Sequence, residues 1–119
     1  MAQQKRRRIE VEEIGDVAVI EFIDKRILDE QNIQLIGEQL FELVDDMGKR
    51  KLLLNFANVE YLSSAALGKL INLKKKVGAV KGKLKLCCIH PDLREVFRIT
   101  RLDQVFEIYS EEQAALDKF

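Results

Sequence analysis

Two adjacent serines, Ser63 and Ser64, stand where an apolar strand passes through a short polar loop into an amphipathic helix. The start of a helix leaves backbone N–H groups unpaired and carries a partial positive charge, so it favours an anion or a phosphoryl group. We expect Ser63 to cap the helix and the side chain of Ser64 to point outward. Spacing alone leaves two interpretations open for Ser64: a solvated serine at a helix start, or an acceptor of a phosphoryl group.

Catalytic chemistry has little support in the sequence. The Gly-x-Ser-x-Gly pattern of hydrolases is absent, and His90 is the only histidine that could act as a base. His90 precedes a proline in a predicted turn, where a surface or capping role is expected. One histidine and an adjacent cysteine pair do not provide the spacing of a zinc site. We therefore expect no catalytic residue, no metal and no cofactor.

Composition limits the partners of the chain. Its 119 residues include 20 basic and 20 acidic side chains, so no net charge attracts it to nucleic acid or to membranes. The basic run Lys5–Arg8 leads into glutamates, and we expect residues 1–5 to form a flexible arm. No apolar run is long enough to span a bilayer and none resembles a secretion signal, which predicts a cytoplasmic protein. Cys87 and Cys88 are adjacent on a predicted strand, so we expect two buried thiols on opposite faces.

Hydrophobic periodicity predicts the secondary structure. Strands are expected at about 6–12 and 16–23, joined by a Gly15-Asp16 turn, and again at 52–56, 83–89 and 105–109. Residues 24–28 are expected to form a loop. Four helices follow the pattern of caps and apolar stripes. They comprise one capped by Asp29 with the stripe Ile33, Ile36, Leu40, Val44 and Met47 and closed by Gly48, one at 64–77, one at 92–98 after Pro91, and one capped by Ser110 that ends near Lys118.

This order of strands and helices predicts one α/β domain over residues 1–119. Right-handed crossovers place the helices against a mostly parallel sheet of about five strands, and the first hairpin makes the sheet mixed.

Three stretches of the chain resemble the STAS-domain family, and within it the bacterial anti-sigma factor antagonists. The family pattern Asp-Ser-Ser/Thr-Gly-Leu-Gly, which opens a helix after an apolar strand, is matched by residues 63–68, Ser-Ser-Ala-Ala-Leu-Gly. Leu28-Asp29 matches a recurring Leu-Asp at the start of the first helix. His90-Pro91 with Val96-Phe97 resembles a late proline-phenylalanine stretch. The likeness extends from about residue 9 to residue 116.

The resemblance implies a role for each residue of this motif. The serine that kinases phosphorylate in the family falls on Ser64. Ser63 stands in place of the family aspartate, and Ala66 stands in place of the family glycine. The implied partners are a GHKL-type anti-sigma factor that is also a serine kinase, bound while Ser64 is unphosphorylated, and a phosphatase that acts on phosphoserine.

The implied partner-binding surface surrounds Ser64. We expect most of its apolar residues to be core, with one or two left exposed as a patch for the partner. Its members are Leu28, Asp29, Tyr61, Leu62, Ser63, Ala65, Ala66, Leu67 and Gly68. Two alternative functions stay open: a STAS-type sensor that holds a nucleotide or another anion at the helix start, and a scaffold module that is not phosphorylated.

Overall fold

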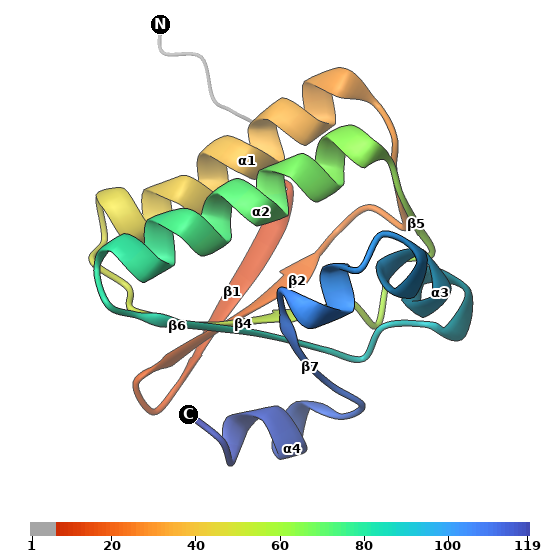
Figure 1. Ribbon diagram of the computed structural model, residues 1–119. Coiled ribbons are helices and arrows are strands. Elements are labelled where there is room, and N and C mark those ends of the chain that lie inside the picture. The colour runs from red at the N-terminus through yellow and green to blue at the C-terminus, as the bar shows by residue number, and fades with distance from the viewer. Residues whose placement is uncertain (1–6) are drawn as a thin grey trace, which may run out of the picture.

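The computed structural model describes residues 7–119, so the predicted arm at residues 1–5 lies outside the described part of the chain. Within residues 7–119 the elements follow one another in the order strand, strand, strand, helix, strand, strand, helix, strand, helix, short 3₁₀ helix, strand, helix (Figure 1). Their bounds are β1 Ile9–Ile14, β2 Val17–Phe22, β3 Arg26–Ile27, α1 Glu30–Asp45, β4 Lys51–Asn55, β5 Tyr61–Leu62, α2 Ser64–Ala79, β6 Lys83–Cys87, α3 Pro91–Ile99, η1 Leu102–Gln104, β7 Glu107–Tyr109 and α4 Glu112–Leu116.

The main sheet of the described chain has five strands in the order β1-β2-β4-β6-β7. β1 and β2 are antiparallel and the other neighbours are parallel. The predicted mixed, mostly parallel sheet with four helices is confirmed for residues 7–119. α1 and α2 lie side by side on one face of the sheet, and α4 lies on the other (Figure 1).

The alternation of side chains along β2 divides the core into two parts. Ile20 and Phe22 belong to the large cluster under α1 and α2, whereas Val17 and Val19 pack with Leu53 and α4. This division is the period-2 pattern that the sequence predicts. Because β4 and β6 are covered on both faces in the same way, α2 and the loop before it are held against a fixed support.

A second, two-stranded sheet was not predicted. β3 lies within the expected loop 24–28 and pairs in parallel with β5, so that Arg26 is opposite Tyr61 and Ile27 is opposite Leu62. Two residues are too few to show a hydrophobic period, which is why the sequence pattern did not reveal either strand.

The start of α1 agrees with the sequence better than its end. The side chain of Asp29 accepts a hydrogen bond from the Asn32 amide at 3.1 Å, as predicted for a cap. Gly48 has a positive φ of 66°, and the amide of Lys49 returns to the Leu43 carbonyl at 2.8 Å, which closes the helix. The prediction that Met47 belongs to the apolar stripe was wrong: the helix has already ended, and its side chain is 62% exposed.

Two predictions near the C-terminal end were also wrong. α4 begins at Glu112 with Glu111 in the cap position, so Ser110 does not cap it. Cys88 lies outside β6 with a φ of +64°, and its Sγ is 3.3 Å from that of Cys87. Both thiols therefore pack on the α4 side, because a left-handed residue interrupts the alternation expected of a strand. Burial raises the pKa of the Cys87 thiol far above its ordinary value.

Candidate functional site: the start of the second long helix

Ser63 caps α2, as the sequence predicts. Its backbone is extended, with a φ of −79° and a ψ of 167°, and its side-chain oxygen accepts a hydrogen bond from the Ala66 amide at 3.2 Å. Its own amide donates to the Ile27 carbonyl at 3.1 Å, which ties the start of α2 to β3. The side-chain oxygen and the backbone amide of Ser63 therefore both fix the position at which the chain enters the helix.

Ser64 is the first residue of α2, and it is exposed. In an α-helix the amides of the first two residues, here Ser64 and Ala65, have no acceptor within the helix. The first turn of α2 contains no acidic residue that would offset the partial positive charge of the helix end. A hydroxyl is thus presented to solvent at a position suited to a negative charge.

The N-terminal ends of α1 and α2 lie next to each other. The pairing of β3 with β5 brings together the segments that follow each strand: Leu28 and the cap Asp29 after β3, and the cap Ser63 after β5. The two helices then run side by side in the same direction (Figure 1). α1 has a carboxylate at its cap and Glu30 in its first turn, whereas α2 has a neutral cap. The partial charge at the start of α2 is therefore the less compensated of the two.

Exposed apolar side chains surround this junction. Leu28 is 43% exposed and Tyr61 is 48% exposed, in agreement with the expectation that one or two apolar residues are left on the surface. Ile23, which follows β2 and was missed, is 41% exposed, and its amide donates to the Arg8 carbonyl beside β1. We refer to Leu28 and Tyr61 as the junction patch. Large apolar side chains gathered beside one polar site are typical of a protein-binding surface.

Three expected members of the partner-binding set lie below this surface. Leu62, Ala66 and Leu67 are buried in the main core, where they hold the junction in place. Ala65 and Asp29 are exposed, and Gly68 is half-buried.

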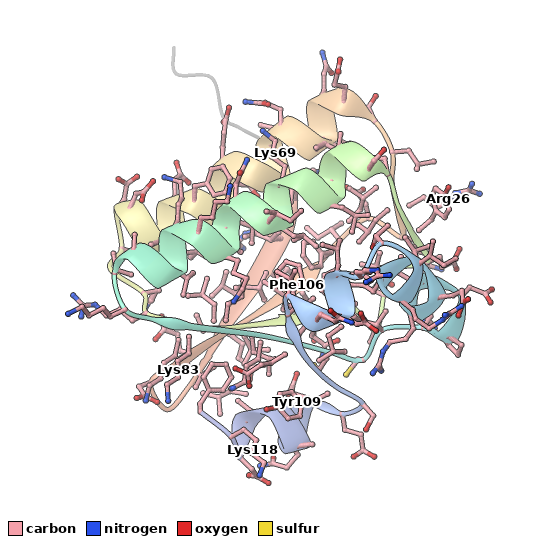
Figure 2. The ribbon with its side chains drawn as sticks, viewed as in Figure 1. Arg26, Lys69, Lys83, Phe106, Tyr109 and Lys118 are labelled. Atoms are coloured by element: carbon pink, nitrogen blue, oxygen red, sulfur yellow. The ribbon has the colours of Figure 1, made fainter. Side chains whose placement is uncertain are left out.

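Arg26 is a further residue that the sequence analysis missed. It lies directly opposite Tyr61 in the small sheet, and its side chain extends outward from the edge of the molecule (Figure 2). Since Ile27 and Leu62 point into the core, the alternation of β3 and β5 places Arg26 and Tyr61 on the outward face. No signal in the sequence marks this cation, because the strand that carries it was not recognised.

His90 has a structural task beside the site. Its Nε2 is 2.7 Å from the Ala57 carbonyl oxygen. Because a carbonyl oxygen only accepts, the ring N–H donates this hydrogen bond, which joins the start of α3 to the loop after β4. This contact matches the surface or capping role expected for the only histidine. Within residues 7–119, no three His, Cys, Asp or Glu side chains gather closely enough to hold a metal ion. No helix in the same part of the chain combines the length and apolar character needed to cross a membrane.

Comparison with known protein families classifies the chain. The sequence model of the STAS domain family matches residues 8–115. The chain belongs to the STAS domain family. The family resemblance predicted from the serine motif is therefore confirmed.

Named STAS relatives are similar over most of this chain. A candidate anti-sigma factor antagonist of Bordetella bronchiseptica, BtrV, is 30% identical over 93 residues, which cover 78% of this chain and 79% of that protein. The solved structure of an anti-sigma-factor antagonist domain from Planctomyces limnophilus is 29% identical with a TM-score of 0.79, covering 91% of this chain and 93% of that one. The structure of the Bacillus protein SpoIIAA in its phosphorylated form shares the fold, with a TM-score of 0.70 at 19% identity over 92% of this chain and 97% of that one.

Proposed function

We propose that this STAS protein is an anti-sigma factor antagonist of a partner-switching pathway, and that it catalyses no reaction itself. The names of its relatives support the antagonist role, since BtrV and the Planctomyces limnophilus protein are both described in these terms. In this proposal the unphosphorylated protein binds an anti-sigma factor of the GHKL kinase type in the bacterial cytoplasm. Phosphorylation of Ser64 ends the complex, and a phosphatase restores it.

The observation that carries the proposal is the exposure of Ser64 beside the junction patch. Its side chain lies at the surface on the first residue of α2, and Leu28 and Tyr61 are exposed close to it in the chain's fold. A kinase can reach such a hydroxyl, and the same partner can cover the apolar side chains around it.

Electrostatics provides the switch. A phosphoryl group adds about −1.5 to −2 charges at pH 7. The start of α2 tolerates this charge, because its unpaired amides and its dipole favour an anion there. The protein is therefore expected to remain folded in both forms. A partner that covers the junction patch must remove water from the phosphate, which weakens the complex unless the partner supplies cations.

The first experiment tests the modified residue. The protein is incubated with ATP and purified candidate GHKL kinases from its own genome, and phosphate is mapped by mass spectrometry. We expect one phosphate on Ser64 and none in Ser64→Ala, whereas Ser110→Ala, which removes another exposed serine, is modified normally. Phosphate on a different residue, or no phosphate with a kinase that binds the protein, contradicts the assignment.

The second experiment tests the switch. Ser64→Asp should weaken binding of that kinase by at least about tenfold, or roughly 1.4 kcal/mol, while Ser64→Ala and Ser110→Asp bind like the wild type. Equal binding by all variants would favour a scaffold module that does not depend on phosphorylation. A rise in melting temperature with nucleotides alone would favour an anion sensor.

A further inference from the structure

β1 is a free edge of the main sheet. It is the terminal strand of the order β1-β2-β4-β6-β7 and has six residues. The Ile23 amide donates to the Arg8 carbonyl at 3.1 Å, so the Arg8 carbonyl faces β2. Along an antiparallel strand, residues whose backbone groups face the neighbouring strand alternate with residues whose backbone groups face away from it. The backbone groups of Ile9, Val11 and Glu13 therefore point away from β2. No other strand within residues 7–119 pairs with this edge, so it can accept a further strand.

Two surface hollows follow the same edge, one on each face of the sheet. The hollow on the α1 side has a volume of about 390 Å³, and the hollow on the opposite side has a volume of about 250 Å³. Both are lined by Arg7 and Val11. An extended chain laid along β1 would send alternate side chains into each hollow in turn.

The hollow on the α1 side is lined by the apolar residues Ile9, Val11, Leu43 and Met47, together with Arg7, Gln39 and Glu42. Ile9 and Leu43 are buried, and Met47 lines the hollow with 62% of its surface exposed. Methionine is flexible and adapts to apolar side chains of different shapes. This hollow therefore fits the apolar side chains of an added strand.

The hollow on the opposite face is acidic. Glu10 lies directly opposite Glu21 in the register of β1 and β2, and Glu12 points to the same face. Like charges in directly opposed positions destabilise a sheet. Among the residues that the structure describes, none of these three carboxylates forms an ion pair. Arg7 is the one basic residue among those lining the hollow, so the carboxylates outnumber it and favour basic side chains.

A second copy of this chain does not match that pattern. Antiparallel pairing of two β1 strands about Val11 places Glu10 of one copy opposite Glu12 of the other, beside the Glu21 of each. The repulsion acts against self-association. We propose that the free edge of β1 binds an extended segment of another protein whose side chains alternate between apolar and basic. This mode is strand addition, in which backbone hydrogen bonds give affinity and alternate side chains give specificity.

The proposal does not depend on Ser64. β1 is at the outer edge of the main sheet, while Ser64 begins the helix that leads from β5 toward β6. A segment bound to β1 would leave the junction patch free, so the protein could hold two partners at once.

The probe is a synthetic peptide of about eight residues in which lysine and valine alternate, with blocked ends. We expect it to slow hydrogen exchange of the Ile9, Val11 and Glu13 amides by about tenfold or more, measured by NMR. The Ser64 and Ala65 amides should be unchanged. A peptide in which glutamate and valine alternate should have no effect, and added salt should weaken the lysine peptide.

Charge removal gives the matched control. The double variant Glu10→Gln with Glu12→Gln should bind the lysine peptide about fivefold more weakly, as expected for two exposed ion pairs. Asp103→Asn, which removes an exposed acid in η1 next to the other sheet edge, should bind normally. Equal effects of the two peptides, or normal binding by the double variant, would overturn the proposal. If these amides are protected from exchange without peptide, and the protection increases with protein concentration, the edge binds a second copy of the chain and the proposal is overturned.

Discussion

The side-chain oxygen of Ser63 accepts a hydrogen bond from the amide of Ala66 at 3.2 Å, so the first of two adjacent serines holds the helix and the second faces solvent. This division of tasks assigns structure to Ser63 and leaves the surface position to Ser64. In the family pattern the capping position carries aspartate, and serine is an equally suitable cap. The replacement therefore preserves the helix start.

Removal of the Ser63 cap should lower the stability of the protein but leave the hydroxyl of Ser64 exposed to solvent. We expect Ser63→Ala to lower the free energy of unfolding by about 1 kcal/mol in urea titrations. Ser63→Asp should be as stable as the wild type, because its carboxylate caps the helix and faces its positive end. Ser64→Ala serves as the control and should change stability by less than about 0.5 kcal/mol. A larger loss for Ser64→Ala than for Ser63→Ala would contradict this division of tasks.

The junction patch should contribute to partner binding without supporting the fold. Tyr61→Ala and Leu28→Ala are each expected to weaken binding of the partner kinase by about tenfold or more, as for apolar residues at the centre of an interface. Their melting temperatures should stay near that of the wild type, since both side chains are largely exposed. Ile99→Ala is the control, because Ile99 is exposed on α3. Calorimetry that finds unchanged affinity for both patch variants would remove this surface from the interface.

Two glycines near the end of α2 should respond in opposite ways to alanine. At Gly82 a methyl group would overlap the backbone carbonyl oxygen of Arg50, so Gly82→Ala should be strongly destabilising. At Gly78, inside the helix, nothing lies within contact distance, and Gly78→Ala should stabilise by about 0.5–1 kcal/mol. Urea unfolding measures both. A neutral Gly82→Ala would contradict the close approach of Gly82 to the Arg50 carbonyl oxygen.

The pair formed by Lys85 and Glu107 should make stability depend on pH. The Lys85 side chain is buried, and its Nζ is 2.6 Å from Glu107 Oε1. The lysine also lies over the ring of Tyr109, the last residue of β7, on the side of the sheet that α4 covers (Figure 2). This hydrogen bond lowers the pKa of Glu107 below its ordinary value of 4.5. The stabilisation is therefore complete above pH 4.5 and is lost as the pH falls through the lower folded-state pKa.

Comparison with Glu107→Gln isolates this effect. The wild type should be the more stable protein at pH 7, and the difference should shrink as the pH falls below that range. Its size is limited by solvent screening, since the Glu107 side chain is 63% exposed. Adding Lys85→Met to Glu107→Gln removes the buried charge as well and should recover stability. A difference that is constant from pH 7 to low pH would rule out the ion pair as its source.

Much of the fold followed from local patterns in the sequence. The Asp29 and Ser63 caps, the Gly48 helix end and the positions of the main strands along the chain are each set by neighbours within about one or two turns of chain. The two faces of β2 could be predicted for the same reason, because alternation along one strand assigns each side chain to a side.

Errors arose where the local signal was short or broken. β3 and β5 have two residues each, and Cys88 departs from the strand by a single left-handed residue. Met47 continued the helical spacing beyond the point at which the backbone turned away. The pairing of β3 with β5 depends on contact between distant segments. Met47 instead follows from the local helix end at Gly48, which the spacing of apolar residues does not register.

The sequence by itself determined that two serines open an amphipathic helix after a buried strand, because hydrophobic period and capping chemistry are properties of adjacent residues. Tertiary structure alone decided what surrounds them. The pairing of Arg26 with Tyr61 brings the starts of α1 and α2 together and exposes the junction patch, and the position of β1 in the sheet leaves its edge open. Such neighbours are set by long-range packing, in which the burial of Ile27 and Leu62 outweighs what either short strand prefers alone.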